Sequence, residues 1–337
     1  MTARGGIRTR RAIGALAALL ASVLLLFGSG HAWGAEGRNA PGDMNTAAAN
    51  PFAGRRMYVN PNSDARQQAE AWASSRRDDA ALMRRMADQP QAVWFGDWNR
   101  DPRGDVDRLL ASAQGQLAVV SVYNIPYRDC GLYSRGGSGG ADEYRRWILD
   151  FSRGIRGRPL AIVLEPDALP GADCLPARLR DERFVLIRDA ADALKKAGAF
   201  VYLDAGNANW KSPQDMATRL NQAGIESADG FALNVSNFQP VKAITAYGDR
   251  LSGLVAGKHY VVDTSRNGRG STSSREWCNP RGQGLGPLPT ASTSNALVDA
   301  FLWVKVPGQS DGTCNGGPNA GKWWPDYALE LARGAAQ

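Results

Sequence analysis

Aspartates follow the apolar runs of this sequence in an arrangement that suits acid–base chemistry. The runs lead to acidic residues at Asp97, Asp129, Asp167, Asp204, Asp263 and Asp311. One aspartate after a strand is usually a turn former or a helix cap, but turns alone hardly explain a succession of them. In a parallel barrel the carboxyl ends of the strands meet on one face, where active sites lie. Positioned carboxyl groups transfer protons, so the pattern predicts an acid–base site.

Tryptophans accumulate near the same strand ends or in the loops that follow them: Trp94, Trp98, Trp210, Trp277, Trp303, Trp323 and Trp324. A flat indole face stacks on the apolar face of a sugar ring. The alternative interpretation is core packing, which we expect for Trp303 because it lies inside an apolar run. The combination of aspartate and tryptophan on one face indicates a saccharide ligand.

Histidine is too scarce for most other catalytic sites. His31 lies in the predicted leader, which leaves His259, so zinc sites built from several histidines are excluded. A Ser-His-Asp triad needs one histidine, but His259 begins an apolar run, at the wrong end of a barrel strand for chemistry. An aldolase would use a central lysine such as Lys305, but the sequence gives it no Schiff-base context. We expect neither a metal nor a cofactor.

The N-terminus is typical of an exported protein. Residues 1–35 combine a basic start, an apolar stretch (12–27) and small residues, as in a signal peptide. A retained membrane anchor is the alternative, but the stretch is short for a bilayer span. The formal net charge of +7 falls to about +3 without Arg4, Arg8, Arg10 and Arg11. That charge does not support binding to nucleic acid or to an anionic membrane, and we expect a secreted monomer.

Short apolar runs alternate with helical patterns over a single domain, predicted at 51–337 after a disordered lead-in at 36–50. Such alternation is typical of a parallel α/β fold. The expected strands are Arg56–Asn60, Ala92–Gly96, Leu117–Asn124, Leu160–Pro166, Phe200–Ala205, Gly230–Asn237, His259–Ser265 and Phe301–Val306. Eight strands favour a TIM-like barrel. A doubly wound sheet is the alternative, although no GxGxxG motif follows the first strand.

The four cysteines are an even set, which in an exported protein predicts disulfides. Three pairings are possible. We favour Cys130–Cys174 and Cys278–Cys314, which join nearest neighbours in the sequence. A metal site is the alternative, but no CxxC spacing supports it.

The chain resembles glycoside hydrolase family 6, the cellulases that include endoglucanases and cellobiohydrolases. The resemblance covers roughly residues 50–331 and rests on the order and spacing of several segments, among them "QAVWFGDW", "VVSVYNIPYRDCGLYSRGG", "IVLEPDALP", "VYLDAGNANW", "YVVDTSRNGRG" and "LWVKVPGQSDGTCN". It implies a distorted α/β barrel with fewer closed strands than the regular eight, an inverting mechanism, and disulfides at the favoured pairings.

The resemblance also implies roles for individual residues. Asp167 in "LEPDAL" looks like the general acid, Asp129 in "YRDC" like the carboxylate that raises the pKa of that acid, and Asp311 in "QSDG" matches the proposed base. Like-charge repulsion from Asp129 would keep Asp167 protonated. Inversion needs room for a water molecule, roughly 6.5–9.5 Å between the acid and base carboxyls.

Further residues are expected to contact a β-1,4-glucan substrate: Tyr123, Trp94, Asp97, Asp204, Asn207, Trp210, Asn234, Trp277, Lys305 and Gln309. The chain departs from the family at Gln309, because the usual "PGESDG" has a glutamate there. Glutamine keeps a carbonyl acceptor and loses the charge, which affects affinity and pH dependence more than the type of reaction.

The loops favour internal cleavage of the glucan. The segment after Asp311 is short and must bring Cys314 back to Cys278, and the segment 131–144 is rich in glycine, as expected of a mobile flap. The sequence therefore predicts a secreted inverting endo-β-1,4-glucanase. The alternatives are an exo-acting cellobiohydrolase of the same family and an inactive saccharide-binding barrel.

Overall fold

A computed structural model of the chain describes residues 50–270 and 276–335. The predicted signal peptide (1–35) and the lead-in (36–50) lie outside this part, apart from Asn50. The Asn50 side chain donates to the backbone oxygen of Asp299 at 2.8 Å, so the described fold begins at that contact.

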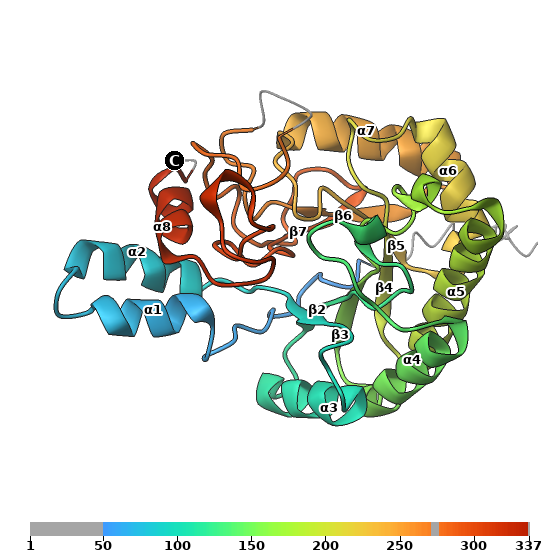
Figure 1. The fold of residues 1–337 in the computed structure, drawn as a ribbon, viewed down its shortest axis with the longest axis horizontal. Coiled ribbons are helices and arrows are strands. Elements are labelled where there is room, and N and C mark those ends of the chain that lie inside the picture. The colour runs from blue at the N-terminus through green and yellow to red at the C-terminus, as the bar shows by residue number, and fades with distance from the viewer. Residues whose placement is uncertain (1–49, 271–275, 336–337) are drawn as a thin grey trace, which may run out of the picture. The chain divides into compact units, whose positions relative to one another are not determined.

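The core is one parallel sheet of seven strands in chain order, β1-β2-β3-β4-β5-β6-β7. It curls within a ring of helices (Figure 1). The strands are β1 Val93–Phe95, β2 Ala118–Val122, β3 Leu160–Leu164, β4 Phe200–Asp204, β5 Gly230–Leu233, β6 His259–Asp263 and β7 Val298–Leu302. This arrangement is the predicted distorted α/β barrel.

Seven of the eight expected strands form. The run Arg56–Asn60 does not: Met57 makes one isolated bridge to Leu117, and Pro61 follows directly, which cannot continue a ladder. The last strand lies a few residues earlier than expected, at Val298–Leu302 instead of Phe301–Val306. The count of eight taken from the apolar runs was wrong, because a short apolar run does not by itself reveal whether it pairs with a neighbouring strand, whereas the resemblance implied fewer closed strands.

The sheet does not close into a complete barrel, because β1 and β7 share no ladder. Two contacts span the gap between them. The backbone N–H of Ala92 donates to the oxygen of Trp303 at 2.9 Å, and the Trp94 indole N–H donates to the oxygen of Val304 at 2.8 Å. Trp94 therefore lies at the seam, near the carboxyl ends of both edge strands.

The strands are buried on both faces, as parallel strands require. On β3, Leu160, Ile162 and Leu164 pack against the helices, while Ala161 and Val163 face the barrel interior. Because the side-chain period of a strand is two residues, the near-continuous apolar runs separate into these two layers. The strand ends are then the places where polar side chains can gather.

Helices α3 to α7 cover the outer face of the sheet (Figure 1). The helices are α1 Asp64–Trp72, α2 Arg77–Ala87, α3 Pro102–Ala113, α4 Ala141–Ile155, α5 Ala177–Lys196, α6 Pro213–Gln222, α7 Val241–Leu254 and α8 Pro325–Arg333. Several begin at N-caps readable from the sequence: Asp101 accepts from the N–H of Gly104, and Ser212 accepts from that of Asp215. Helices α1, α2 and α8 pack around a separate cluster that includes Met83 and Trp303.

Three consecutive strand ends are tied together by one carboxylate. Asp263, the buried last residue of β6, accepts the N–H groups of Ser236 after β5, of Ser265 after β6, and of Val304 and Lys305 after β7, at 2.9–3.2 Å. The sequence placed Asp263 among the candidate acid–base residues. The structure shows it saturated by backbone donors, so its role is to fix the rim of the barrel.

Replacement of Asp263 should therefore destabilise the fold. In Asp263→Asn an NH₂ group faces backbone donors, so some N–H groups lose their acceptor. We expect the free energy of unfolding to fall by about 3–5 kcal/mol, as measured by urea denaturation. Asp142→Asn, at an exposed position on α4, is the matched control and should change little. Equal denaturation midpoints for the two variants would contradict the role of Asp263.

Candidate active site

The three predicted catalytic carboxyls all follow strands at the same end of the sheet. Asp167 lies after β3, Asp129 after β2 and Asp311 after β7. The residues around the acid adopt unusual backbone conformations, with φ of +53° at Glu165, +67° at Asp167 and +56° at Asp129. Left-handed conformations are costly for residues other than glycine and concentrate at functional sites. They turn these side chains sharply out of the strand direction.

Asp167 is set up to hold a proton. Its backbone N–H donates to a carboxylate oxygen of Asp204 at 2.8 Å. Burial, together with the negative charges of Asp129 and Asp311, raises the pKa of Asp167 to about 7, and the positive charge of Lys305 only partly offsets this. The influence of both aspartates shows that the fold brings the three carboxyls together. A carboxyl that stays protonated near neutral pH is suited to act as a general acid.

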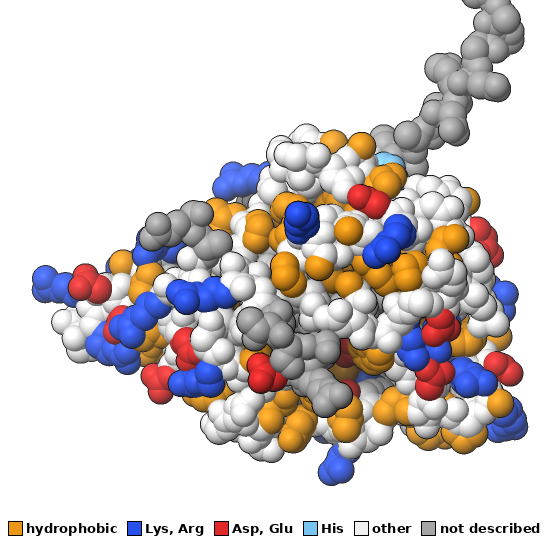
Figure 2. Space-filling model, turned by 90° about the horizontal axis from the view of Figure 1, so that it is seen from above, with side chains coloured by type: hydrophobic (Ala, Val, Ile, Leu, Met, Phe, Trp, Pro, Cys, Tyr) orange, Lys and Arg blue, Asp and Glu red, His pale blue; other side chains and the backbone are white. Residues whose placement is uncertain are grey.

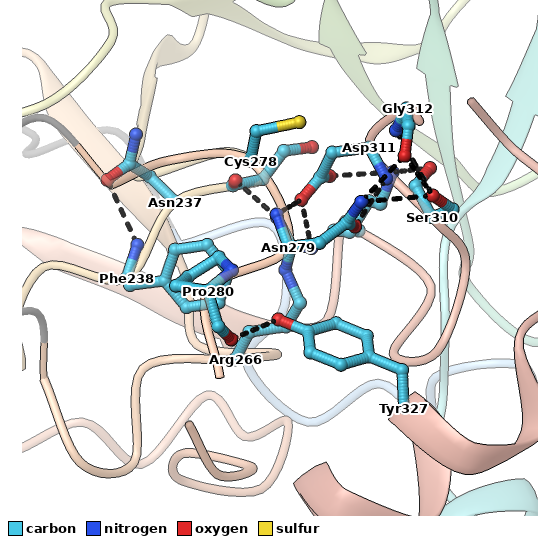
Figure 3. A network of polar contacts seen from close by, with 12 residues as sticks. Asn237, Phe238, Arg266, Cys278, Asn279, Pro280, Ser310, Asp311, Gly312 and Tyr327 are labelled. Atoms are coloured by element: carbon cyan, nitrogen blue, oxygen red, sulfur yellow. Dashed lines mark hydrogen bonds and ion pairs between the residues drawn. The ribbon is translucent and has the colours of Figure 1, made fainter. Parts of the chain in front are cut away.

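Asp311 has the opposite electrostatic environment. One carboxylate oxygen accepts from the Arg266 guanidinium at 2.8 Å and from the Asn279 N–H at 3.0 Å, and the other lies 3.2 Å from the Lys305 ammonium. Burial alone would raise the pKa of Asp311, but the charges of Arg266 and Lys305 lower it overall. Figure 3 shows Asp311 beside Asn279, with Arg266 next to Phe238. Asp311 is therefore the ionised carboxylate of the site.

Asp129 lies on a loop held at both ends. It accepts the N–H of Ser134 at 2.6 Å, and its neighbour Cys130 is joined to Cys174 by a disulfide. Burial raises the pKa of Asp129, while the Ser134 N–H and the charge of Arg128 oppose this rise. The loop therefore keeps a second carboxyl group close to Asp167.

Both favoured disulfides form. The bridges are Cys130–Cys174 and Cys278–Cys314, and they span 44 and 36 residues. In the chain-entropy model, loops of this length contribute about 4 kcal/mol each. The first bridge ties the loop of Asp129 to the loop after β3, and the second ties Asn279, which holds Asp311, to the segment after Asp311. The disulfides thus hold the site's loops and not the core.

A cavity of about 720 Å³ opens at the seam between β1 and β7. None of Asp129, Asp167 and Asp311 lines it, but Lys305, which pairs with Asp311, does. It contains four of the predicted substrate-binding residues: Trp94, Tyr123, Lys305 and Gln309. The Trp94 and Tyr123 rings meet edge to face with their centroids 5.3 Å apart. Burial raises the pKa of Tyr123, and the negative charges of Asp167 and Asp129 add to this rise. Tyr123 is therefore the lining residue that connects the cavity with the carboxyls electrostatically.

Gln309, the residue that departs from the family pattern, is oriented by a carboxylate. Its side-chain NH₂ donates to Asp64 at 3.1 Å. Asp64 is the first residue of α1 and also lines the cavity. This contact uses the NH₂ group of Gln309, so its side-chain carbonyl remains available as an acceptor. The Asp64 carboxylate lies directly behind the Gln309 amide. No local pattern indicated Asp64, because its partner lies 245 positions along the chain.

Two further predicted platforms lie outside this cavity. Trp210, after β4, is 41% exposed and packs over Gly171 and Gly206, and Trp277 is 39% exposed with its ring centroid 6.2 Å from that of Tyr133. Asn207 is nearly buried, and its side-chain oxygen accepts from the N–H of Asn209. Of these three residues, Trp210 and Trp277 are exposed enough for a sugar ring to stack on them.

Three other predicted contacts are engaged within the protein. Asn234 has no exposed surface and donates to the backbone oxygen of Asp263 at 2.9 Å. Asp204 is buried beneath Asp167, whose N–H it accepts, and Asp97 pairs with Arg128 at 2.9 Å. The structure therefore shows Asn234 and Asp204 buried in the wall with protein partners, and their contact with a ligand stays a prediction. Sequence position alone could not separate a side chain that faces the cleft from one that turns into the rim.

The loop after Asp129 reaches across the site. The Tyr133 ring lies so close to Gly312 that a Cβ at Gly312 would be 2.3 Å from the ring. No hydrogen bond joins segments 131–137 and 312–322 among the residues that the structure describes. The predicted flap and the opposite loop thus meet through the packing of Tyr133 on Gly312, without a hydrogen bond between them.

Sequence analysis missed the buried groups behind the site. Glu165 accepts the N–H groups of Asn124 and Ile125 at 3.0 Å, and burial raises its pKa to about 7. Arg183, from α5, donates to the backbone oxygens of Pro126, Tyr127 and Ala168. The glutamate of "LEPDAL" was visible, but its partners were not. The Arg183 contacts join the β2 and β3 loops, which carry Asp129 and Asp167.

Within residues 50–270 and 276–335, no group of three or more potential metal-ligating side chains occurs. No helix in those ranges is long and apolar enough to cross a bilayer. His259, at the start of β6, contacts Asp299 at 2.8 Å, at the end of the strand opposite to the carboxyls. The histidine thus takes no part in the site, as its sequence position indicated.

A parallel α/β barrel with paired carboxyls and exposed tryptophans at the strand ends has the architecture of a glycoside hydrolase. The chain belongs to the glycosyl hydrolases family 6, whose model matches residues 52–335. This finding confirms the resemblance seen in the sequence.

The relatives support the same assignment. Endoglucanase A from Cellulomonas fimi is 45% identical over 284 residues, which are 83% of this chain and 61% of that protein. The chain thus spans about three-fifths of that relative. Endoglucanase 1 from Streptomyces halstedii is 37% identical over 293 residues, covering 82% of this chain and 88% of that protein.

Among solved structures, an endoglucanase from Mycobacterium tuberculosis is similar over 85% of this chain and 99% of that chain. The TM-score is 0.81 and the identity 44%. That enzyme was solved in complex with methyl-cellobiosyl-4-deoxy-4-thio-β-D-cellobioside. The similarity therefore extends to a protein whose bound ligand is a cello-oligosaccharide analogue.

Proposed function

We propose that the chain is a secreted endo-β-1,4-glucanase that hydrolyses cellulose-type glucan with inversion and acts as a monomer. The observation that carries the proposal is the contrast between two buried carboxyls: the pKa of Asp167 is raised to about 7, and that of Asp311 is lowered. An acid and an ionised carboxylate at one site are the two groups that glycoside hydrolysis requires. The names of the relatives agree with this activity.

In the proposed reaction Asp167 protonates the glycosidic oxygen as the bond to the anomeric carbon breaks. A water molecule attacks that carbon from the opposite face, and Asp311 is the acceptor for its proton. Asp129 supplies the negative charge that keeps Asp167 protonated until a substrate oxygen is in reach. Tyr123 contacts the sugar beside the acid, and Trp94 and Lys305 bind the neighbouring unit.

Two structural features support an endo mode. The segment 312–322 is held close to the wall by the Cys278–Cys314 bridge and by Ser310, whose hydroxyl donates to the oxygen of Pro318. The opposite loop contacts it where Tyr133 packs on Gly312, and no hydrogen bond joins the two segments among the described residues. A cleft crossed by packing without hydrogen bonds admits a chain internally more readily than a fixed roof, which would require a chain end. The exo-acting alternative is the less favoured one on this ground.

The surface agrees with a neutral polysaccharide as partner. Figure 2 shows basic and acidic side chains interspersed over the face in view, without a patch of one sign. A protein that binds nucleic acid presents clustered lysine and arginine. Export is proposed from the leader-like residues 1–35.

The activity is tested by viscometry and reducing-end assays on carboxymethylcellulose. The wild-type protein should lower viscosity quickly for few new reducing ends. Asp167→Ala should lose about 10²–10⁴ in rate through loss of the general acid, with Asp142→Ala as the surface control. Near-normal hydrolysis by Asp167→Ala would remove this residue from the acid role, and slow viscosity loss with cellobiose as the main early product would indicate an exo mode.

The pH dependence follows from the two shifted pKa values. Asp167 acts when protonated, so kcat/KM should fall as pH rises through about 7. Asp311 must stay ionised, and its lowered pKa places the acidic limb below that of an ordinary aspartate. In Asp129→Asn the charge that raises the pKa of Asp167 is removed, so the alkaline limb should move to lower pH. An unmoved alkaline limb in this variant would show that Asp129 does not tune the acid.

Inversion predicts the stereochemistry of the first product. A single displacement at the anomeric carbon of a β-linkage gives an α-anomer. Proton NMR of cellohexaose digests, recorded before mutarotation, measures this directly. An initial β-anomer would instead indicate a covalent intermediate and retention.

A further inference from the structure

Trp98 lines the same cavity as Trp94, and the proposed reaction gives Trp98 no role. Its side chain is 53% exposed and lines the cavity next to Tyr123 and Arg128. An exposed indole on a soluble protein is often incidental. This one differs because the surrounding turn fixes its orientation.

The turn Gly96–Asn99 is held by hydrogen bonds at Gly96, Asp97 and Asn99. The Asn99 side-chain oxygen accepts the N–H of Gly96 at 3.0 Å, and the Asn99 N–H donates to the oxygen of Gly96 at 2.9 Å. Asp97 is fixed by Arg128 at 2.9 Å and by the N–H of Gly137 at 3.2 Å. Trp98 is the residue that this rigid turn presents to the cavity.

The ring itself is supported from behind. A Cβ on Gly96 would lie 2.5 Å from the six-membered ring of Trp98, so the indole rests over a position that only glycine allows. The buried Arg128 guanidinium lies 5.2 Å from the Trp98 ring and 4.7 Å from the Tyr123 ring. Cation–π contact of this kind holds an aromatic plane in place. The exposed part of the ring is left free to stack.

The order of the strands places this platform relative to the acid. Asp167 follows β3, Tyr123 follows β2, and Trp94 and Trp98 belong to β1 and the loop after it. Along the sheet, Tyr123 at the end of β2 therefore lies between Asp167 after β3 and the tryptophans of β1 and its loop. Both tryptophans lie at the edge-strand end of this series. Trp94 is part of β1 and is half-buried, whereas Trp98 follows the strand and is mostly exposed, so Trp98 is the outer of the two.

We infer that Trp98 stacks a glucosyl unit of the β-1,4-glucan chain at the outer end of the cavity, further from the cleavage point than the unit on Trp94. The inference rests on the proposed function for the identity of the sugar. It adds one binding position to the site, so Trp98 favours longer chains over short ones. A cellotetraose that occupies the positions nearest the acid does not need it, whereas a cellohexaose reaches it.

The test is calorimetric titration of cellotetraose and cellohexaose into Asp167→Ala, with and without Trp98→Ala. We expect Trp98→Ala to weaken cellohexaose binding about 10-fold and to leave cellotetraose within about 2-fold. Trp98→Phe, which keeps a ring, should recover part of the loss. Leu288→Ala, an equally exposed apolar residue away from the cavity, is the matched control.

Each result decides the question. Unchanged cellohexaose binding in Trp98→Ala would overturn the inference. An equal loss for both oligosaccharides would also overturn it, because Trp98 would then act through Arg128 and Tyr123 and not as an outer platform. Hydrolysis by the otherwise unaltered protein is measured in parallel. Tight cellohexaose binding without cleavage of any glucan would reject the proposed activity while leaving the platform intact.

Discussion

The site depends on one constraint, which is how buried negative charge is balanced at the strand ends. Asp311 has two cations, Arg266 and Lys305, within hydrogen-bonding distance and stays ionised. Asp167 has no ion-pair partner among the described residues, and its neighbours are other carboxyls. A buried carboxyl without a counter-ion keeps its proton. The unequal sharing of two cations among three aspartates thus separates an acid from a carboxylate within one cleft.

That distribution persists only because the loops carrying the aspartates cannot rearrange. Glu165 and Arg183 fix the segments after β2 and β3, and Asp263 fixes those after β5, β6 and β7. These buried groups bond mainly to backbone, so they determine where the loops lie without entering the cleft. Backbone strain at Asp167 is tolerated for the same reason: Asp204 holds its N–H in place. The supports are themselves charged groups, and removal of one partner leaves the other unsatisfied.

Sequence reasoning predicted the parts of this arrangement that have a local signature. Alternating apolar runs predicted the parallel sheet. Motifs predicted Asp129, Asp167 and Asp311 as the catalytic carboxyls, and they also predicted the disulfide pairs. The strand expected at Arg56–Asn60 does not form, and Asp204 and Asn234, expected to contact the substrate, lie buried in the rim. Both findings depend on which segment pairs with a neighbouring strand and on which way a side chain turns. The contacts of Asp64 with Gln309 and of Arg183 with the β2 loop are set by tertiary packing, which no local pattern records.

The central claim is that Asp167 remains protonated near neutral pH in the folded protein, and direct titration tests it. Carbon-13 NMR of protein labelled at aspartate carboxyls would follow the Asp167 resonance, assigned by its absence in Asp167→Asn. The account predicts a midpoint near pH 7. A midpoint close to 3.8, the value of an ordinary aspartate, would contradict it, because the group would then be ionised when a proton has to be delivered.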